Sequence, residues 1–208
     1  DIGQVMFGPT MTISSDLWKQ NQSKQHAKPN KWILSDLEDG GGGVIPYTYD
    51  KKNYVNALQW SIGLELFLMV NDPWRVFLTT DHPNGGPFTM YPKLIRLLMD
   101  KEFRESEMNG LNSEARNTSL LGSLKREYSL YEIAIMTRAS PANILGLNDR
   151  GSLKPGKIAD ISIYDPKKPI DEMFSYAYLL FKEGKEIVKN GKITNITSGN
   201  TLNVKLTY

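Results

Sequence analysis

A short apolar run that stops at a cluster of chain-breaking residues most restricts how this sequence can fold. Residues 76–80, Val-Phe-Leu-Thr-Thr, are mostly β-branched or aromatic, which favours a short buried β-strand. The prolines and glycines at 83–87 prevent the strand from continuing. We therefore expect Asp81 at the C-terminal tip of a strand, where α/β barrels carry their catalytic groups.

Helical patterns flank this run on both sides. Residues 56–70 place apolar side chains around most of the helical circumference, which predicts a largely buried helix. Residues 91–101 repeat apolar positions at helical spacing, with Pro92 in the first turn. The stretch 102–119 has little core-forming content, so a helix and an irregular excursion both stay open there. The succession of helix, short connector and strand is typical of an α/β protein.

Two cap signals predict a pair of short tandem helices further along the chain. Ser129 and Glu132 have the spacing of a capping box, in which each side chain accepts a hydrogen bond from a free amide of the first turn. Ser140 and Pro141 predict a second helix start, with a serine cap and a proline in the first position. Gly146 is then expected in the left-handed conformation that ends a helix.

From residue 151 the pattern changes to short strands joined by turns. The segments expected to form strands are 158–164, 176–181, 186–188 and 193–196. Glu183-Gly184 and Asn190-Gly191 are expected to be the turns, and Asn-Gly is the strongest short hairpin signal. The last third is therefore predicted to be a small antiparallel sheet on an α/β body, with domains at 1–150 and 151–208.

Composition excludes several classes of protein. The 208 residues carry 25 basic and 23 acidic side chains, so a net charge of +2 gives no argument for nucleic-acid or membrane binding. The absence of cysteine excludes disulfides, thiolate nucleophiles and zinc fingers. No apolar stretch approaches the roughly 20 residues of a membrane span. Because the sequence starts without Met and without a secretory pattern, we expect part of a longer protein.

Several segments resemble known protein families. The strand ending at Asp81, residues 140–147 (Ser-Pro-Ala-Asn-Ile-Leu-Gly-Leu) and residues 151–161 (Gly-Ser-Leu-Lys-Pro-Gly-Lys-Ile-Ala-Asp-Ile) resemble the C-terminal part of the amidohydrolase superfamily, in the family's order. More narrowly, the segments that resemble the A subunits of formylmethanofuran dehydrogenases are 3–9, 63–67 and 79–89. The resemblance implies the last strands and helices of a partial TIM-type barrel, followed by a segment of a composite β-sandwich.

The resemblance also implies a reaction and its partners. The complete protein would form or hydrolyse the N-formyl bond of formylmethanofuran with two zinc ions, in methanogenesis or other one-carbon metabolism. Methanofuran and formate would be its substrates, the other dehydrogenase subunits its partners, and the cytoplasm its location. Asp81 would act as metal ligand and catalytic base, while His82 and Asn84 would contact the substrate. The family's His-x-His pair and carboxylated lysine have no match in the sequence, so we expect the chain to be inactive alone.

The residues themselves leave alternatives open. By position alone, Asp81 and Asn84 could simply stabilise a turn. Adjacent residues of a strand point to opposite faces, so His82 is better suited to a structural role or substrate contact than to the metal that Asp81 would bind. His26 lies in a polar segment that favours the surface. The alternative functions are another metal-dependent amidohydrolase and a non-catalytic structural or interaction module.

Two further carboxylates are expected to be structural. Glu65 lies within an apolar helical pattern, where an unpaired carboxylate would be unfavourable, so we expect an ion pair with Arg75 or Arg138. Asp160 is expected to bind backbone or turn groups in the β-module and is assigned no chemistry.

Overall fold

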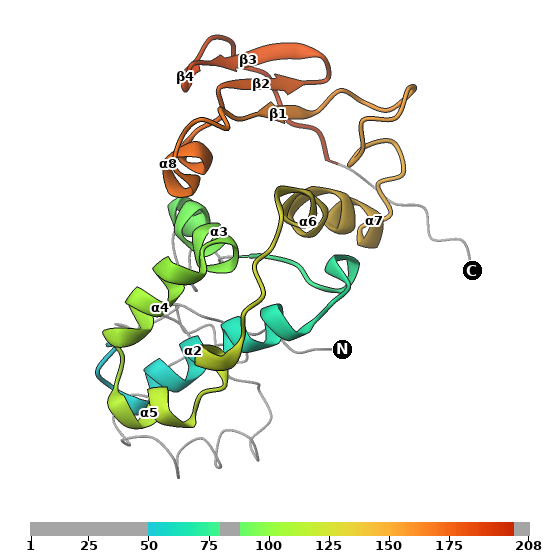
Figure 1. Cartoon of the computed structure of the whole chain (residues 1–208). Coiled ribbons are helices and arrows are strands. Elements are labelled where there is room, and N and C mark those ends of the chain that lie inside the picture. Colours follow the sequence, from blue (N-terminus) through green and yellow to red (C-terminus); the bar gives the residue numbers. More distant parts are fainter. Residues whose placement is uncertain (1–49, 80–87, 202–208) are drawn as a thin grey trace, which may run out of the picture. The chain divides into compact units, whose positions relative to one another are not determined.

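A computed structural model describes residues 50–79 and 88–201 (Figure 1). The α-helices are α2 (Tyr54–Met69), α3 (Tyr91–Met99), α4 (Lys101–Asn109), α5 (Ser113–Thr118), α6 (Leu130–Ala134), α7 (Ser140–Ile144) and α8 (Ile170–Ser175). The 3₁₀ helices are η2 (Pro73–Arg75), η3 (Phe88–Met90) and η4 (Leu121–Ser123), and η5 (Ile135–Ala139) is a π-helix. The strands are β1 (Ile161–Ile163), β2 (Leu179–Lys182), β3 (Lys185–Lys189) and β4 (Lys192–Ile193).

These elements form two compact units, each assembled from segments that are distant in sequence. The first unit contains α2, η3, α4, α5 and η4, and the second contains η2, α3, α6, η5, α7, α8 and the sheet. The combination of helices with a small antiparallel sheet agrees with the predicted class at this coarse level. The domain boundary near residue 150 remains a prediction.

The first unit is built around α2, which confirms the helix predicted over 56–70. Leu64 and Ala57 are completely buried, and α2 packs against α5 and η4. Its burial is less complete than expected, because the side chain of Ile62 is 41% exposed. The stretch that was left open between 102 and 119 forms α4 and α5, where Asn112 caps α5 by accepting hydrogen bonds from two amides of its first turn.

The predicted strand at 76–80 is wrong for the part that the structure describes. Residues 76–79 form no strand, although Val76 has an extended backbone and both Val76 and Leu78 are buried. Alternate burial is what an extended chain produces, but a β-strand also needs a neighbouring strand to share its hydrogen bonds. The sequence pattern indicates the extended conformation and cannot supply the partner.

The capping box at the start of α6 is confirmed. The Glu132 amide donates to Ser129 Oγ at 3.3 Å, and the Ser129 amide donates to Glu132 Oε2 at 2.8 Å. Gly146 adopts the expected left-handed conformation, with φ of 68°. Both signals are local, because each depends on backbone groups that lie within a few residues of the side chain.

The predicted serine cap at Ser140 is wrong. The chain stays helical from α6 through η5 into α7, and Ser140 itself has helical angles, with φ of −67° and ψ of −46°. Pro141 lacks an amide hydrogen, so the Thr137 carbonyl cannot receive its usual helical hydrogen bond. Arg138 Nη1 donates to that carbonyl instead, at 3.0 Å. The π-helix therefore allows the helical conformation to continue through Pro141.

The antiparallel sheet is confirmed, with strand order β1-β2-β3-β4 (Figure 1). Both predicted turns have two residues at positive φ: Glu183 and Asn190 lie near 50°, and each is followed by a glycine. This geometry matches the twist of a two-residue hairpin. The strands are mostly shorter than predicted, and no strand residue is buried.

One helix was missed within the part of the chain predicted to be all-β. α8 comes between β1 and β2 in the sequence, buries Met173 and packs against α3 (Figure 1). Its six residues are too few to establish a helical period against a strand period in the sequence. The ring of Phe174 in α8 lies 4.9 Å from the ring of Tyr164, which follows β1.

Candidate functional site

The residues predicted to carry the chemistry lie outside the described part of the structure. Asp81, His82 and Asn84 fall between residues 79 and 88, and His26 falls before residue 50. Their roles therefore remain predictions. The structure does describe the segment that leads toward them, Val70–Leu78, which we call the approach segment.

Side-chain hydroxyl groups from three separate parts of the chain bind carbonyl groups of the approach segment. The hydrogen bonds run from Tyr128 Oη to the Val70 carbonyl (3.5 Å), from Ser140 Oγ to the Trp74 carbonyl (2.7 Å) and from Tyr91 Oη to the Leu78 carbonyl (3.3 Å). These roles were not predicted: Ser140 was expected to cap a helix, and the two tyrosines had no expected role. A hydroxyl group carries no sequence signal for a partner more than ten residues away.

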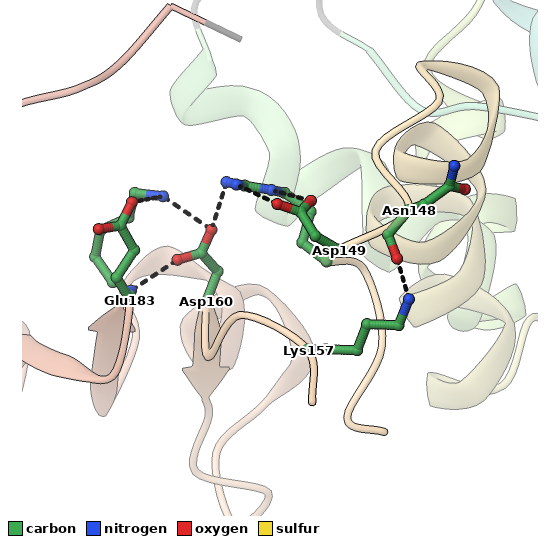
Figure 2. A network of polar contacts seen from close by, with 7 residues as sticks. Asn148, Asp149, Lys157, Asp160 and Glu183 are labelled. Carbon is green, nitrogen blue, oxygen red and sulfur yellow. Dashed lines mark hydrogen bonds and ion pairs between the residues drawn. The ribbon is translucent and has the colours of Figure 1, made fainter. Parts of the chain in front are cut away.

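A second group of polar contacts joins the loop after α7 to the β2–β3 turn (Figure 2). Asp160 Oδ1 accepts the Glu183 amide at 2.9 Å. Its other oxygen, Oδ2, accepts Lys182 Nζ at 2.9 Å and Arg150 Nη1 at 3.1 Å. Arg150 also donates two hydrogen bonds to Asp149, and Lys157 donates to the Asn148 carbonyl. The structural role predicted for Asp160 is confirmed.

The electrostatics of this group also indicate a structural role. Burial alone would raise the pKa of Asp160, but hydrogen bonds from Lys182 and the Glu183 amide, with the charges of Lys182 and Arg150, lower it overall. The hydrogen bond from Arg150 likewise lowers the pKa of Asp149. Both carboxylates are therefore held ionised and already paired. A carboxylate in this state is poorly suited to accept a proton near neutral pH.

The predicted ion pair of Glu65 is wrong. Glu65 Oε1 accepts hydrogen bonds from Ser119 Oγ at 2.6 Å and from the Leu120 amide at 2.8 Å. Arg75 pairs instead with Asp72 at 3.2 Å, and Arg138 binds Tyr164 Oη and the Thr137 carbonyl. The carboxylate was correctly expected to need partners, but neutral donors at the end of α5 supply them. Hydrogen bonds can compensate a half-buried carboxylate in place of a cation.

The described residues do not provide a metal site. Among them, no three His, Cys, Asp or Glu side chains lie together in a way that could hold an ion, and both histidines of the chain fall outside this part.

The helices in the same part of the chain are too short or too polar to cross a membrane.

Comparisons with known proteins establish the class. The model of the amidohydrolase family matches residues 13–193, and the chain belongs to this family. The A subunit of the formyltransferase/hydrolase complex Fhc from Methylorubrum extorquens is 48% identical over 98% of the chain. The protein FwdA from Methanocaldococcus jannaschii is 41% identical over 98% of the chain. The chain spans 37% of the length of each of these curated relatives.

A solved structure extends the likeness to three dimensions. The chain matches part of the crystal structure of the FhcABCD complex from Methylorubrum extorquens, which was determined with methylofuran bound. The TM-score is 0.77 at 48% identity, and the match covers 95% of this chain and 36% of the solved one. The resemblance expected from segments 3–9, 63–67 and 79–89 is thereby confirmed, and it concerns the C-terminal part of these relatives.

Proposed function

We propose that the protein to which this chain belongs forms or hydrolyses the N-formyl bond of formylmethanofuran, as one member of a larger complex. The observation that carries this proposal is the 48% identity to the Fhc A subunit over 98% of the chain. The likeness to a complex crystallised with methylofuran supports a furan-type amine carrier as substrate and other subunits as partners. The cell compartment proposed is the cytoplasm, and the metabolism is methanogenesis or another one-carbon route.

The chemistry requires a group that moves one proton. In hydrolysis, water adds to the formyl carbon, the C–N bond breaks, formate leaves, and the amine of methanofuran takes up a proton. A carboxylate beside the water can accept that proton and return it to the amine, and reversal of the same steps forms the amide. Asp81 is the residue we propose for this role, because it belongs to segment 79–89, which carries the resemblance to the A subunits, and follows the buried Leu78 by three residues. His82 and Asn84 are proposed to contact the substrate.

The proposed metal is a pair of zinc ions in the complete protein. Zinc that activates water generally takes three or more protein ligands. The described residues do not fit that requirement, because no group of three suitable side chains lies together among them. Asp81 could therefore serve as a zinc ligand only with side chains from other parts of the complete protein. For the same reason we propose that the 208-residue chain is inactive alone.

The proposed architecture is a partial TIM-type barrel over 1–150 followed by part of a composite β-sandwich over 151–208, and the sheet supports its second part. Strand register places Ile161 and Phe181 on one face, and Leu180, Val188 and Ile193 on the other. None of these side chains is buried, and Ile193 is 77% exposed. A sheet whose apolar residues are at most half-buried on both faces is typical of a module that is completed by further chain.

Replacement of Asp81 by asparagine in the intact protein tests the proposed function. We expect Asp81→Asn to lower the rate of formate release from formylmethanofuran by about 10²–10⁴-fold, because the proton acceptor is lost. The melting temperature should stay within a few degrees of the wild type. Asp160→Asn is the matched control, and it should keep the activity while lowering thermal stability. Formate release by Asp81→Asn at the wild-type rate would contradict the role of Asp81, and no release by the wild type would contradict the proposed reaction.

A further inference from the structure

The approach segment is held by side-chain hydroxyls at intervals of four residues. Its carbonyls at Val70, Trp74 and Leu78 each accept a hydrogen bond from a side chain outside the segment. The donors belong to α3, to the chain just before α6, and to α7, all within the second compact unit. These contacts do for the segment part of what a neighbouring strand would do in a sheet, because they supply donors to partly buried carbonyl groups.

Ser140 makes the strongest of the three contacts. Its hydroxyl lies 2.7 Å from the Trp74 carbonyl, which is the usual O–H···O distance, while the two tyrosine hydroxyls lie at 3.3 and 3.5 Å. The side chain of Ser140 is only 2% exposed, so water has little access to replace it. The π-helix η5 ends immediately before Ser140, and both η5 and α7 pack against η2, which contains Trp74.

We propose that Ser140 is a positioning residue that fixes the path of the approach segment, with Tyr91 as a second anchor at the segment's end. This inference rests on the proposed function, since the segment leads directly to the proposed proton acceptor. Ser140 acts through the backbone of Trp74 and does not touch the substrate. A displacement of about 1 Å in a catalytic group can slow a reaction about 100-fold, so a backbone anchor close to that group in sequence affects the rate.

Ser61 provides a matched control, because it is also a fully buried serine in a helix. Its hydroxyl donates to the Ala57 carbonyl at 3.0 Å, four residues earlier in α2, so the contact stays within one helix. Ser140→Ala and Ser61→Ala remove the same oxygen atom from equally buried positions. If Ser140 had a purely structural role, the two variants would have the same hydrogen exchange and the same kcat whenever their melting temperatures are equal.

Hydrogen exchange in the intact protein measures the anchoring without reference to activity. The amides of Trp74 and Arg75 are protected by hydrogen bonds to Asp72, so their exchange reports opening of the approach segment. We expect Ser140→Ala to speed exchange in a peptide covering 70–78 by at least about threefold. Ser61→Ala should leave that peptide unchanged. Equal exchange in Ser140→Ala and the wild type would overturn the inference.

Steady-state kinetics of formate release measure the consequence for the reaction. We expect Ser140→Ala to lower kcat by about tenfold or more while KM changes less than about twofold, and Ser61→Ala to change neither. Tyr91→Phe is the second variant, for use if Ser140→Ala does not fold. It removes only a half-buried hydroxyl group, and we expect it to lower kcat by less than Ser140→Ala. An unchanged kcat in these variants of an active protein would overturn the inference. A wild type without formate release would overturn the proposed function, and the anchoring would then be decided by the exchange result alone.

Discussion

Helix α2 and the sheet β1–β4 are both rich in leucine and isoleucine, yet they bury these side chains very differently. Leu64 in α2 is completely buried, and the neighbouring turns of the helix bury Trp60, Phe67 and Leu68 as well. No residue of the four strands is buried, and Ile193 in β4 is 77% exposed. An apolar pattern therefore predicts where an element forms and leaves open whether that element finds a covering partner.

The two regions also differ in what holds them together. Helix α2 is stabilised by burial of apolar surface against α5 and η4, which contributes roughly 25 cal/mol per Å² removed from water. The sheet relies on backbone pairing, on left-handed turn residues at 183–184 and 190–191, and on the ion pairs of Asp160. Substitutions should therefore affect the two regions through different physical terms.

The largest expected effect comes from truncating the core of α2. Leu64→Ala should lower the free energy of unfolding by about 2–5 kcal/mol, because it leaves a cavity where no side-chain atom is exposed. Ile193→Ala, the matched change in the sheet, should cost less than about 0.5 kcal/mol in the 208-residue chain. Urea unfolding measures both values. Equal losses of unfolding free energy in the two variants would refute the contrast between α2 and the sheet. A loss for Ile193→Ala that appears only in the intact protein would indicate that other parts of that protein cover the sheet.

A second test concerns the glycine at which the loop after α7 approaches the helix. Gly151 has φ of +80°, and a Cβ built there would lie 2.4 Å from the Cβ of Ala142. Gly151→Ala should therefore cost about 2–4 kcal/mol, from backbone strain and from a clash that neither backbone can easily relieve. Gly156→Ala is the control: φ is +88° but no atom lies within 4 Å, so only the strain of about 1–2 kcal/mol remains. Equal losses of stability for Gly151→Ala and Gly156→Ala in thermal unfolding would show that the close approach of Gly151 to Ala142 is unimportant.

A third test uses pH to isolate the ion pairs of the sheet. The folded pKa of Asp160 lies below its ordinary value of 3.8, so its stabilising contribution is complete above that value and is lost as the pH falls through the folded pKa. Asp160→Asn should cost about 1 kcal/mol at pH 7 and at pH 5. The difference from the wild type should shrink below about pH 4, as the wild-type carboxyl takes up its proton. A difference that stays constant in urea unfolding down to about pH 2 would show that charge is not its origin.

The smallest expected effect is a gain in the sheet. Lys189 and Lys192 face each other directly across the β3–β4 pair, and like charges in this position repel. Lys189→Glu should raise the free energy of unfolding by about 0.2–0.5 kcal/mol by making the pair attractive. Lys189→Gln removes the repulsion only and should gain less. Added salt should erase the difference between these variants, and a gain that persists at about 1 M salt would indicate another cause.

Local signals in the sequence were sufficient for several elements. The capping box at Ser129, the left-handed Gly146 and the two hairpin turns all appear as predicted, because their geometry is set within about four residues. The long apolar pattern of α2 was also sufficient. Segments 140–147 and 151–161, which carry the resemblance, lie within the residues matched by the amidohydrolase family model.

Errors arose where a partner distant in sequence decided the outcome. Ser140 has the sequence context of a helix cap, but the Trp74 carbonyl lies within reach of its hydroxyl and the helix continues through it. Glu65 was expected to bind an arginine and instead binds Ser119 and the Leu120 amide. Helix α8 was too short to show a period, and its packing against α3 accounts for its stability.

The sequence by itself determined the family, the extended conformation at Val76, the helices with strong periodicity, and the turns between the strands. Tertiary structure alone decided which hydroxyl groups hold the approach segment, which donors satisfy the half-buried carboxylates, and which apolar faces are buried. The physical reason is the range of the interactions. Backbone conformation follows from neighbours a few residues away, whereas hydrogen-bond partners and burial depend on segments that meet only when the chain has folded.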